Sequence, residues 1–387
     1  MTFDRTQTRT TDDFGRWRGV YLPLIAITVF GCYGTGDSES RDRRDINGYE
    51  VIIPCNGCAL TVSDPIVLDP SEISGLTRSS KISLQPAGED VLVAYGPTET
   101  PGELRVTTLN GSSPIRTFGR FGNGPDEMER IRTLAFAGPD TIVVLHSSSI
   151  SVLSLIDSSL SKQGLPPGVS SFELAVSPSR QVFVGNHVPL RRRVIAQAIG
   201  EGQVSEFMGS GLSPGSALEN LGPTEYHLMT GDDGSLIAIP KQEVWSITKW
   251  SADGDSLDGN FIQQPEWFTP FTAAEIDAAR EAKDSGALAS VTYVTDAQVL
   301  GNRYLLVAGR VRDNRPAPGE QAGLAPWNYR NDTVVDVYDL TSNRLVARLQ
   351  FDAVYTYLAP SGHLIRFLED ADGFVSAILR KIEVTSG

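Results

Sequence analysis

Four histidines are the residues of this chain best suited to acid–base or metal chemistry, and each stands alone in the sequence. None has a second ligand at the spacing of a metal-binding motif. The sequence contains no serine nucleophile elbow, no phosphate-binding loop and no paired-cysteine zinc signature. We therefore expect no cofactor and no catalytic centre formed by sequence neighbours. The four histidines are His146, His187, His227 and His363.

An arginine cluster is the first candidate for binding chemistry. Arg191, Arg192 and Arg193 lie shortly after Asn186-His187 in a chain that is acidic overall. Guanidinium groups recognise carboxylates or phosphates through paired donors, so an anionic group on a partner is the expected ligand. The alternative is that these arginines are solvated residues at a strand edge.

The second candidate is the Pro/Gly-rich stretch 312–332, where arginines and aromatic residues are neighbours. Long loops within a compact domain are usually functional or disordered, and aromatic residues beside arginine are common at binding hot spots. The alternative is that the tryptophan only holds its own loop. The candidate residues are Arg312, Trp327, Tyr329 and Arg330.

Cys55 and Cys58 are expected to form a disulfide, because a cysteine pair in an exported chain is commonly oxidised. Covalent haem is excluded because Ala59 occupies the position that requires histidine. A redox role for the Cys-Asn-Gly-Cys motif is the alternative, but the βαβ pattern that houses such motifs is absent.

A repeat of turns and strands organises the chain from residue 88 onward. Six times a cluster of turn residues leads into a short apolar run, at intervals of roughly 40 to 70 residues. A more alternating strand follows each run, a third strand usually comes next, and a fourth precedes each turn. Four strands per unit are typical of a propeller blade. The runs begin at Val91, Thr141, Val182, Leu236, Tyr304 and Leu364.

The sixth unit is one strand short, because the chain ends soon after the segment 374–384. Two early segments, 59–62 and 65–68, belong to no unit. We expect them to supply the missing outer strand and so close the ring. The expected fold is an all-β, six-bladed propeller formed by residues 49–387. A two-domain β-sandwich is the competing interpretation, but no linker-like change in composition occurs between residues 70 and 385.

Residues 1–31 are expected to be a lipoprotein signal peptide. Arg16 and Arg18 precede an apolar run, 20–30, that is too short to span a bilayer. The run leads into Val29-Phe30-Gly31-Cys32, which resembles a lipobox and predicts lipid attachment at Cys32. A plain signal peptide or a single anchor helix is the alternative.

Residues 32–48 have no apolar period, so they predict a flexible tether between the lipid and the folded domain. Tyr33, rather than aspartate, follows the lipidated cysteine. In families with lipoprotein sorting this favours the outer membrane, with the domain facing the periplasm or the cell surface. The formal net charge of −14 argues against nucleic acid as a partner. We expect a monomer.

Residues 118–128, Phe-Gly-Arg-Phe-Gly-Asn-Gly-Pro-Asp-Glu-Met, resemble the signature between the blades of NHL-type six-bladed propellers. Asp126 and Met128 stand where that signature has glycine and phenylalanine. The plan of the whole chain is similar to that of the bacterial six-bladed β-propeller lipoproteins. Most members of that group have no assigned activity, so the resemblance implies a fold and a location rather than a reaction.

The resemblance also implies an alternative function. Propeller enzymes that hydrolyse lactones or cleave peptidylamides hold a metal at the central channel, with ligands from several blades. In this chain His146 and His187 could be joined there by oxygen ligands, which would make the protein a calcium- or zinc-dependent hydrolase or lyase. The oxygen ligands would come from Glu225, Asp232 and Asp233.

The leading expectation is a non-catalytic binding module. In this strand order the tight turns fall on one face, and the insertions fall on the other, including a helix over 272–283 with Thr272 as N-cap. His146 follows the inner strands of the second unit on that loop-bearing face, and we include it among the binding residues. A protein, peptide or glycan of the cell envelope is the expected partner. Trp245, Trp250 and Trp267 are expected to pack in the core.

Overall fold

The computed structural model describes residues 49–386 with gaps, the longest of which are 208–225, 270–291 and 313–330. The predicted signal peptide, lipid-bearing Cys32 and tether lie outside the described residues, as does the predicted helix over 272–283. Every regular element in the described part is a β-strand. The described residues include no helix of the length and hydropathy needed to cross a bilayer.

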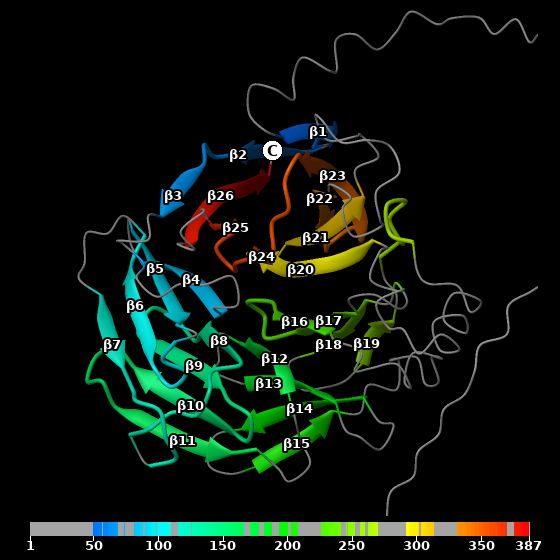
Figure 1. Cartoon of the computed structure of the whole chain (residues 1–387). Coiled ribbons are helices and arrows are strands. Elements are labelled where there is room, and N and C mark those ends of the chain that lie inside the picture. Colours follow the sequence, from blue (N-terminus) through cyan, green and yellow to red (C-terminus); the bar gives the residue numbers. More distant parts are fainter. Residues whose placement is uncertain are drawn as a thin grey trace, which may run out of the picture.

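The described strands form six antiparallel sheets, which we number in chain order (Figure 1). The first sheet contains β4 (Lys81–Ala87), β5 (Asp90–Gly96), β6 (Leu104–Thr108) and β7 (Arg116–Phe118). The second contains β8 (Thr133–Phe136), β9 (Thr141–Leu145), β10 (Ser149–Ser154) and β11 (Leu160–Gly164). The third contains β12 (Ser171–Val176), β13 (Val182–His187), β14 (Arg193–Ile199) and β15 (Gln203–Phe207).

The remaining sheets follow the same order, and two of them gain strands from the N-terminal segment. The fourth sheet contains β16 (Tyr226–Thr230), β17 (Leu236–Pro240), β18 (Thr248–Trp250) and β19 (Ser256–Gly259). The fifth contains β20 (Tyr293–Leu300), β21 (Tyr304–Arg312), β22 (Asn331–Asp339), β23 (Arg344–Phe351) and β1 (Tyr49–Ile53). The sixth contains β24 (Tyr357–Leu358), β25 (His363–Glu369), β26 (Val375–Ser386), β2 (Cys58–Val62) and β3 (Ile66–Leu68).

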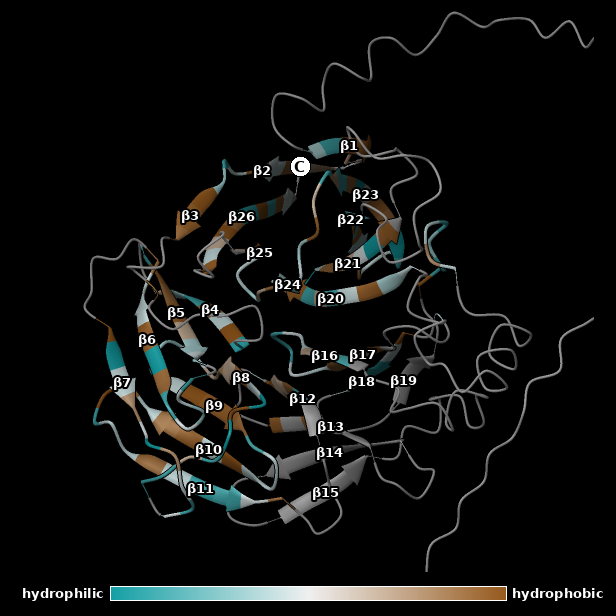
Figure 2. Cartoon of the chain, in the orientation of Figure 1, coloured by the Kyte–Doolittle hydropathy of each residue, from teal (hydrophilic) through white to brown (hydrophobic). Residues whose placement is uncertain are grey.

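A hydrophobic core fills the junction between each sheet and the next. The second strands are rich in apolar residues because neighbouring sheets cover them, as β9 shows beside the more hydrophilic outer strand β11 (Figure 2). The cycle is closed by the core in which Leu84 and Tyr95 of the first sheet pack with Ile365 and Leu379 of the sixth. Cores that link the sheets in a closed cycle define a β-propeller, which confirms the prediction of an all-β propeller.

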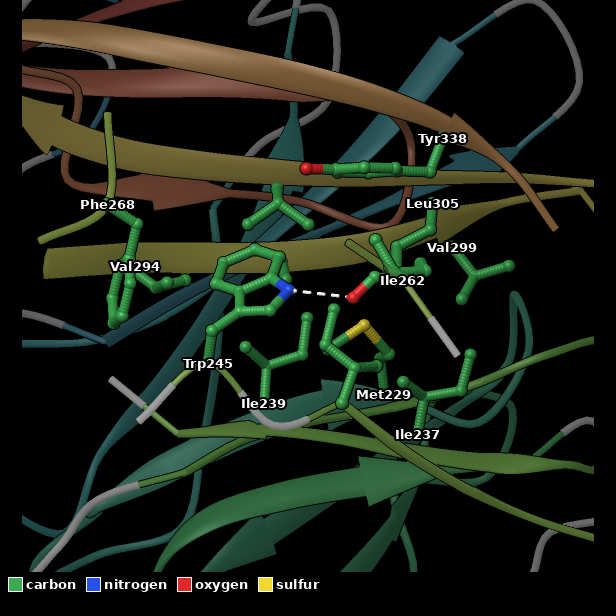
Figure 3. Packing of buried hydrophobic residues seen from close by; sticks show 13 residues of the cluster. Met229, Ile237, Ile239, Trp245, Ile262, Phe268, Val294, Val299, Leu305 and Tyr338 are labelled. Atoms are coloured by element: carbon green, nitrogen blue, oxygen red, sulfur yellow. Dashed lines mark hydrogen bonds between the residues drawn. The ribbon is translucent and has the colours of Figure 1, made fainter. Parts of the chain in front are cut away.

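The core between the fourth and fifth sheets shows how aromatic residues fill these junctions. Trp245 is buried among Ile239, Val294 and Tyr338, and its Nε1 donates a 3.0 Å hydrogen bond to the carbonyl of Ile262 (Figure 3). Satisfying the indole N–H allows the whole ring to be buried. The expectation that Trp245, Trp250 and Trp267 pack in the core is confirmed.

The N-terminal segment closes the ring at two sheets. β2 and β3 both pair antiparallel with β26, so the prediction that segments 59–62 and 65–68 supply the outer strand of the last unit is confirmed. β1 was not predicted as a strand of the ring. It pairs with β23 and adds a fifth strand to the fifth sheet.

The strand order separates the connections onto two faces. The first and second strands of each sheet are joined by short turns, as are the third and fourth in the first five sheets, and both kinds of turn lie on one face. The other connections reach the opposite face, which we call the loop-bearing face. The described strand ends on this face include those that flank residues 208–225, 260–292 and 313–330, most of which lie outside the described residues.

Candidate functional site

The innermost strands of all six sheets surround a central channel (Figure 1). The channel holds a cavity of about 630 Å³. Each innermost strand pairs with a neighbour on one side only, so its other edge turns backbone N–H and C=O groups toward the channel. The lining strands are β4, β8, β12, β16, β20 and β24.

His227 and Asp296 form an ion pair in the wall of this channel. Nδ1 of His227 lies 3.5 Å from Oδ1 of Asp296, and Nε2 lies 3.1 Å from the carbonyl oxygen of Val294. Both ring nitrogens therefore face oxygen atoms of the fifth sheet, and the pair carries opposite charges only when the imidazole is protonated.

Asp296 also joins three neighbouring sheets at the channel. It lies in β20 beside an irregularity in the pairing with β21, between Val294 and Asp296. While its Oδ1 faces His227 of the fourth sheet, its Oδ2 accepts a 2.8 Å hydrogen bond from the backbone N–H of Leu358 in the sixth. The carboxylate of Asp296 therefore links strands of the channel wall and also adds a negative charge to it.

The charges lining the channel limit what it can hold. The carboxylates are those of Glu173, Asp232 and Asp296, and the basic groups are those of Lys81 and His227. With this balance, and with hydroxyls and strand edges on the wall, the channel suits a neutral or cationic hydrophilic molecule better than an anion.

An exposed aromatic residue on the loop-bearing face is held by a rigid turn, residues 119–128, which we call the clasp. Phe121 and Met128 form a bridge in which the N–H of Met128 donates to the carbonyl of Arg120 at 2.8 Å. Met128 is fully buried, so it fills the core position that the NHL-type signature gives to phenylalanine, whereas Phe121 is 65% exposed.

Backbone contacts fix the clasp in place. A Cβ atom on Gly102 would lie 2.3 Å from the Cα of Phe121, so glycine is required where the two segments cross. Within the clasp, the N–H of Gly124 bonds the carboxylate of Glu127 and Arg120 pairs with it, and together they hold the pKa of Glu127 below its usual value. The ring of Phe121 is therefore presented on a preorganised loop.

His146 does not belong to either site, which corrects its prediction as a binding residue. Its side chain has no exposed surface, its Nε2 lies 2.9 Å from Oγ of Ser151, and it is absent from the channel wall. Burial lowers the pKa of its imidazole. The sequence indicated that His146 lies at the end of a strand. It did not indicate that the side chain is buried.

The other predicted binding residues are placed only in part. His187 and Arg193 are partners in the register of β13 and β14, at the loop-bearing end of the third sheet. Arg312 ends β21 opposite Asn331. The remaining candidates, Arg191, Arg192, Trp327, Tyr329 and Arg330, lie outside the described residues.

The predicted cysteine pair is joined. Cys55 and Cys58 have their Cα atoms 5.4 Å apart and form a disulfide between β1 and β2. As for metals, the described residues contain no group of three or more histidine, cysteine or acidic side chains that could hold an ion. Glu225, one of the proposed oxygen ligands, lies outside the described residues, whereas Asp232 and Asp233 occupy the turn after β16.

Sequence reasoning missed the His227–Asp296 pair. Its only signal was a charged or titratable residue inside each of two innermost strands, Tyr226-His-Leu-Met-Thr and Tyr293-Val-Thr-Asp. Nothing in the linear sequence brings residues so far apart together. The curvature of the ring does, because it sets β16 beside β20.

No family model and no curated protein matches this chain. Similar solved structures include a protein of unknown function from Bacteroides thetaiotaomicron, with 10% identity over 84% of this chain and 76% of that chain, at a TM-score of 0.46. The calcium-binding protein regucalcin from Agrobacterium tumefaciens has 13% identity over 87% of this chain and 96% of its own, at 0.46. The WD40 domain of Neurospora crassa Pan2 has 8% identity over 85% and 97%, at 0.45. The assignment as a β-propeller rests on the ring of sheets and cores.

Proposed function

We propose that this protein is a lipid-anchored, six-bladed propeller of the cell envelope that binds a partner at its loop-bearing face and catalyses no reaction. Each of the six sheets would be one blade. The observation that carries the proposal is the distribution of connections: the turns that join first to second strands lie on one face, and the strand ends that flank residues 208–225, 260–292 and 313–330 lie on the other. Such one-sided loops on a rigid scaffold are typical of binding surfaces.

The clasp supports this assignment. A large aromatic side chain that is exposed, yet held by a preorganised backbone, loses little conformational entropy when a partner covers it. Phe121 meets this description on the loop-bearing face. His146, one of the ligands that the metal-dependent alternative would need, is fully buried, which favours binding over metal-dependent catalysis.

The anchor is part of the proposal. The signal peptide would be removed before Cys32, the lipid attached there, and residues 33–48 would tether the propeller to the outer membrane. The partner would be a protein, peptide or glycan that reaches this face from the periplasm or the cell surface.

Site-specific photo-crosslinking in intact cells tests the binding face. Phe121 is replaced by p-benzoyl-phenylalanine, which keeps an aromatic ring at this position. The matched control places the same amino acid at Ile156, which is 79% exposed in a turn on the opposite face. We expect a discrete adduct from position 121 and none from position 156. An adduct from position 156 alone, or from neither position, would overturn the proposed face.

A further inference from the structure

The N-terminal segment presents aliphatic side chains to solvent at the outer rim of the propeller. Among the described residues, seven large hydrophobic side chains are exposed, and four of them belong to β1 and β3. These strands lie at the periphery of the fifth and sixth sheets (Figure 1). We call these four side chains the apolar rim: Val51, Ile52, Ile66 and Val67.

The outer strands of the sixth sheet, β2 and β3, contain no charged residue, whereas β1 carries Glu50. The outermost strands of the first four sheets carry Arg116, Lys162, Glu206 and Asp258. By contrast, residues 51–68 contain one charged residue, Asp64, in a chain that is 21% charged. Natural edge strands are normally blunted by charge, so an uncharged and exposed edge indicates that something covers it.

The rim is held firmly, so its exposure is built into the fold. β2 and β3 pair with β26, and the disulfide joins the end of β1 to the start of β2. Between β2 and β3, the N–H of Ser63 donates to the carbonyl of Lys381 at 2.9 Å, and the N–H of Lys381 donates to Oγ of Ser63 at 2.9 Å. Val67 therefore stays 58% exposed while the next residue, Leu68, is buried.

We propose that the apolar rim rests on the lipid bilayer, and this inference depends on the proposed anchor at Cys32. Only residues 33–48 separate that cysteine from β1, and an extended chain of this length spans ~55 Å at most. The rim strands are thus the part of the propeller that lies nearest to the proposed anchor along the chain. The acidic net charge of −14 points to the apolar interface of zwitterionic lipid rather than to anionic headgroups.

Contact through the rim sets the orientation of the molecule. The propeller would stand on its edge, with the channel axis parallel to the membrane. Both ends of the channel and the loop-bearing face would then remain open to partners approaching along the membrane surface.

Spin labelling of the full, lipidated protein in phosphatidylcholine vesicles tests this contact. A nitroxide is attached to Val67→Cys, with Ile156→Cys as the control; Cys55 and Cys58 are paired, and Cys32 would carry the lipid, so the introduced thiol is the free one. We expect the label at position 67 to lose most of its collisions with a water-soluble nickel complex and to gain several-fold in collisions with oxygen. The label at position 156 should keep its aqueous accessibility.

The outcomes separate this inference from the anchor itself. If the protein fails to float with the vesicles, the lipid anchor is wrong. If it floats and the label at position 67 stays as accessible to nickel as the label at 156, only the rim contact is wrong. A label at 67 that is already shielded before vesicles are added would also overturn the contact, because a second copy or residues 1–48 would then cover the rim.

A second variant keeps the test independent of the label. Val51→Asp in the labelled background adds a charge to the other exposed strand of the rim, and we expect it to restore nickel accessibility at position 67 while flotation is retained. Unchanged shielding in this variant would contradict membrane contact through β1.

Discussion

At the scale of residues, three of the histidines, His146, His227 and His363, are buried in contacts within the fold. His227 is fixed between Asp296 and a backbone carbonyl, and His146 is buried against Ser151. His363 is buried as well, with its Nδ1 2.8 Å from Oγ of Ser361. Because burial disfavours the charged imidazolium, a buried neutral histidine makes stability depend on pH.

His363→Gln is expected to reduce the acid sensitivity of the protein. Burial, with a smaller effect of Lys381, lowers the pKa of His363 from 6.5 to about 4. Between these values the unfolded chain binds a proton that the folded chain excludes, so the wild-type protein loses stability as the pH falls from 6.5 to 4. The full shift corresponds to about 3 kcal/mol.

Urea unfolding of both proteins at pH 7 and pH 4.5 measures this effect. The variant should lose less stability than the wild type between the two pH values, by about 2 kcal/mol, whatever its stability at pH 7. Equal losses in the two proteins would show that His363 does not carry the acid sensitivity assigned to it.

At the scale of elements, the strands were largely predictable, while the contacts between sheets were not. The six apolar runs fall in β5, β9, β13, β17, β21 and β25, because a strand covered by neighbouring sheets is rich in apolar residues. The pairing of β2 and β3 with β26 followed from counting strands in an incomplete last unit.

Two features of the strands could not be predicted from the local sequence. β1 has the sequence Tyr49-Glu-Val-Ile-Ile, which could form an edge strand of any sheet, so its pairing with β23 could not be predicted from these residues. The His227–Asp296 pair joins strands from different sheets, and its geometry is set by the packing of the ring. Periodicity reports which face of a strand is buried but not which distant strand covers it.

The alternation of β3 gives a prediction at this scale. Leu68 is 2% exposed in the core between the sixth and first sheets, whereas its neighbour Val67 points to solvent. Leu68→Ala should lower the free energy of unfolding by about 2–5 kcal/mol, because it leaves a cavity in that core. The matched change Val67→Ala should cost little in the absence of membrane. Similar losses in the two variants, measured by urea unfolding, would mean that β3 does not close the ring as described.

At the scale of the whole molecule, the ring is closed by parts of the chain that are far apart in sequence. The C-terminal strand β26 pairs along its outer edge with β2 and β3. Leu68 of β3 lies in the core that joins the sixth sheet to the first. A propeller depends on every junction, because an open junction exposes two sheet faces at once. The N-terminal segment therefore contributes to the stability of the entire ring rather than to one edge.

Two truncations distinguish this role from that of the tether. A chain that starts at residue 49 keeps β1, β2 and β3 and should unfold in urea with the same midpoint as a chain that starts at residue 33. A chain that starts at residue 69 lacks all three strands, leaves the edges of β23 and β26 unpaired and removes Leu68 from its core. The loss of that one side chain already costs about 2–5 kcal/mol, so the shorter chain should unfold at a much lower urea concentration or aggregate. If it instead unfolded at the same midpoint and in one cooperative transition, the ring would be stable without its N-terminal closure.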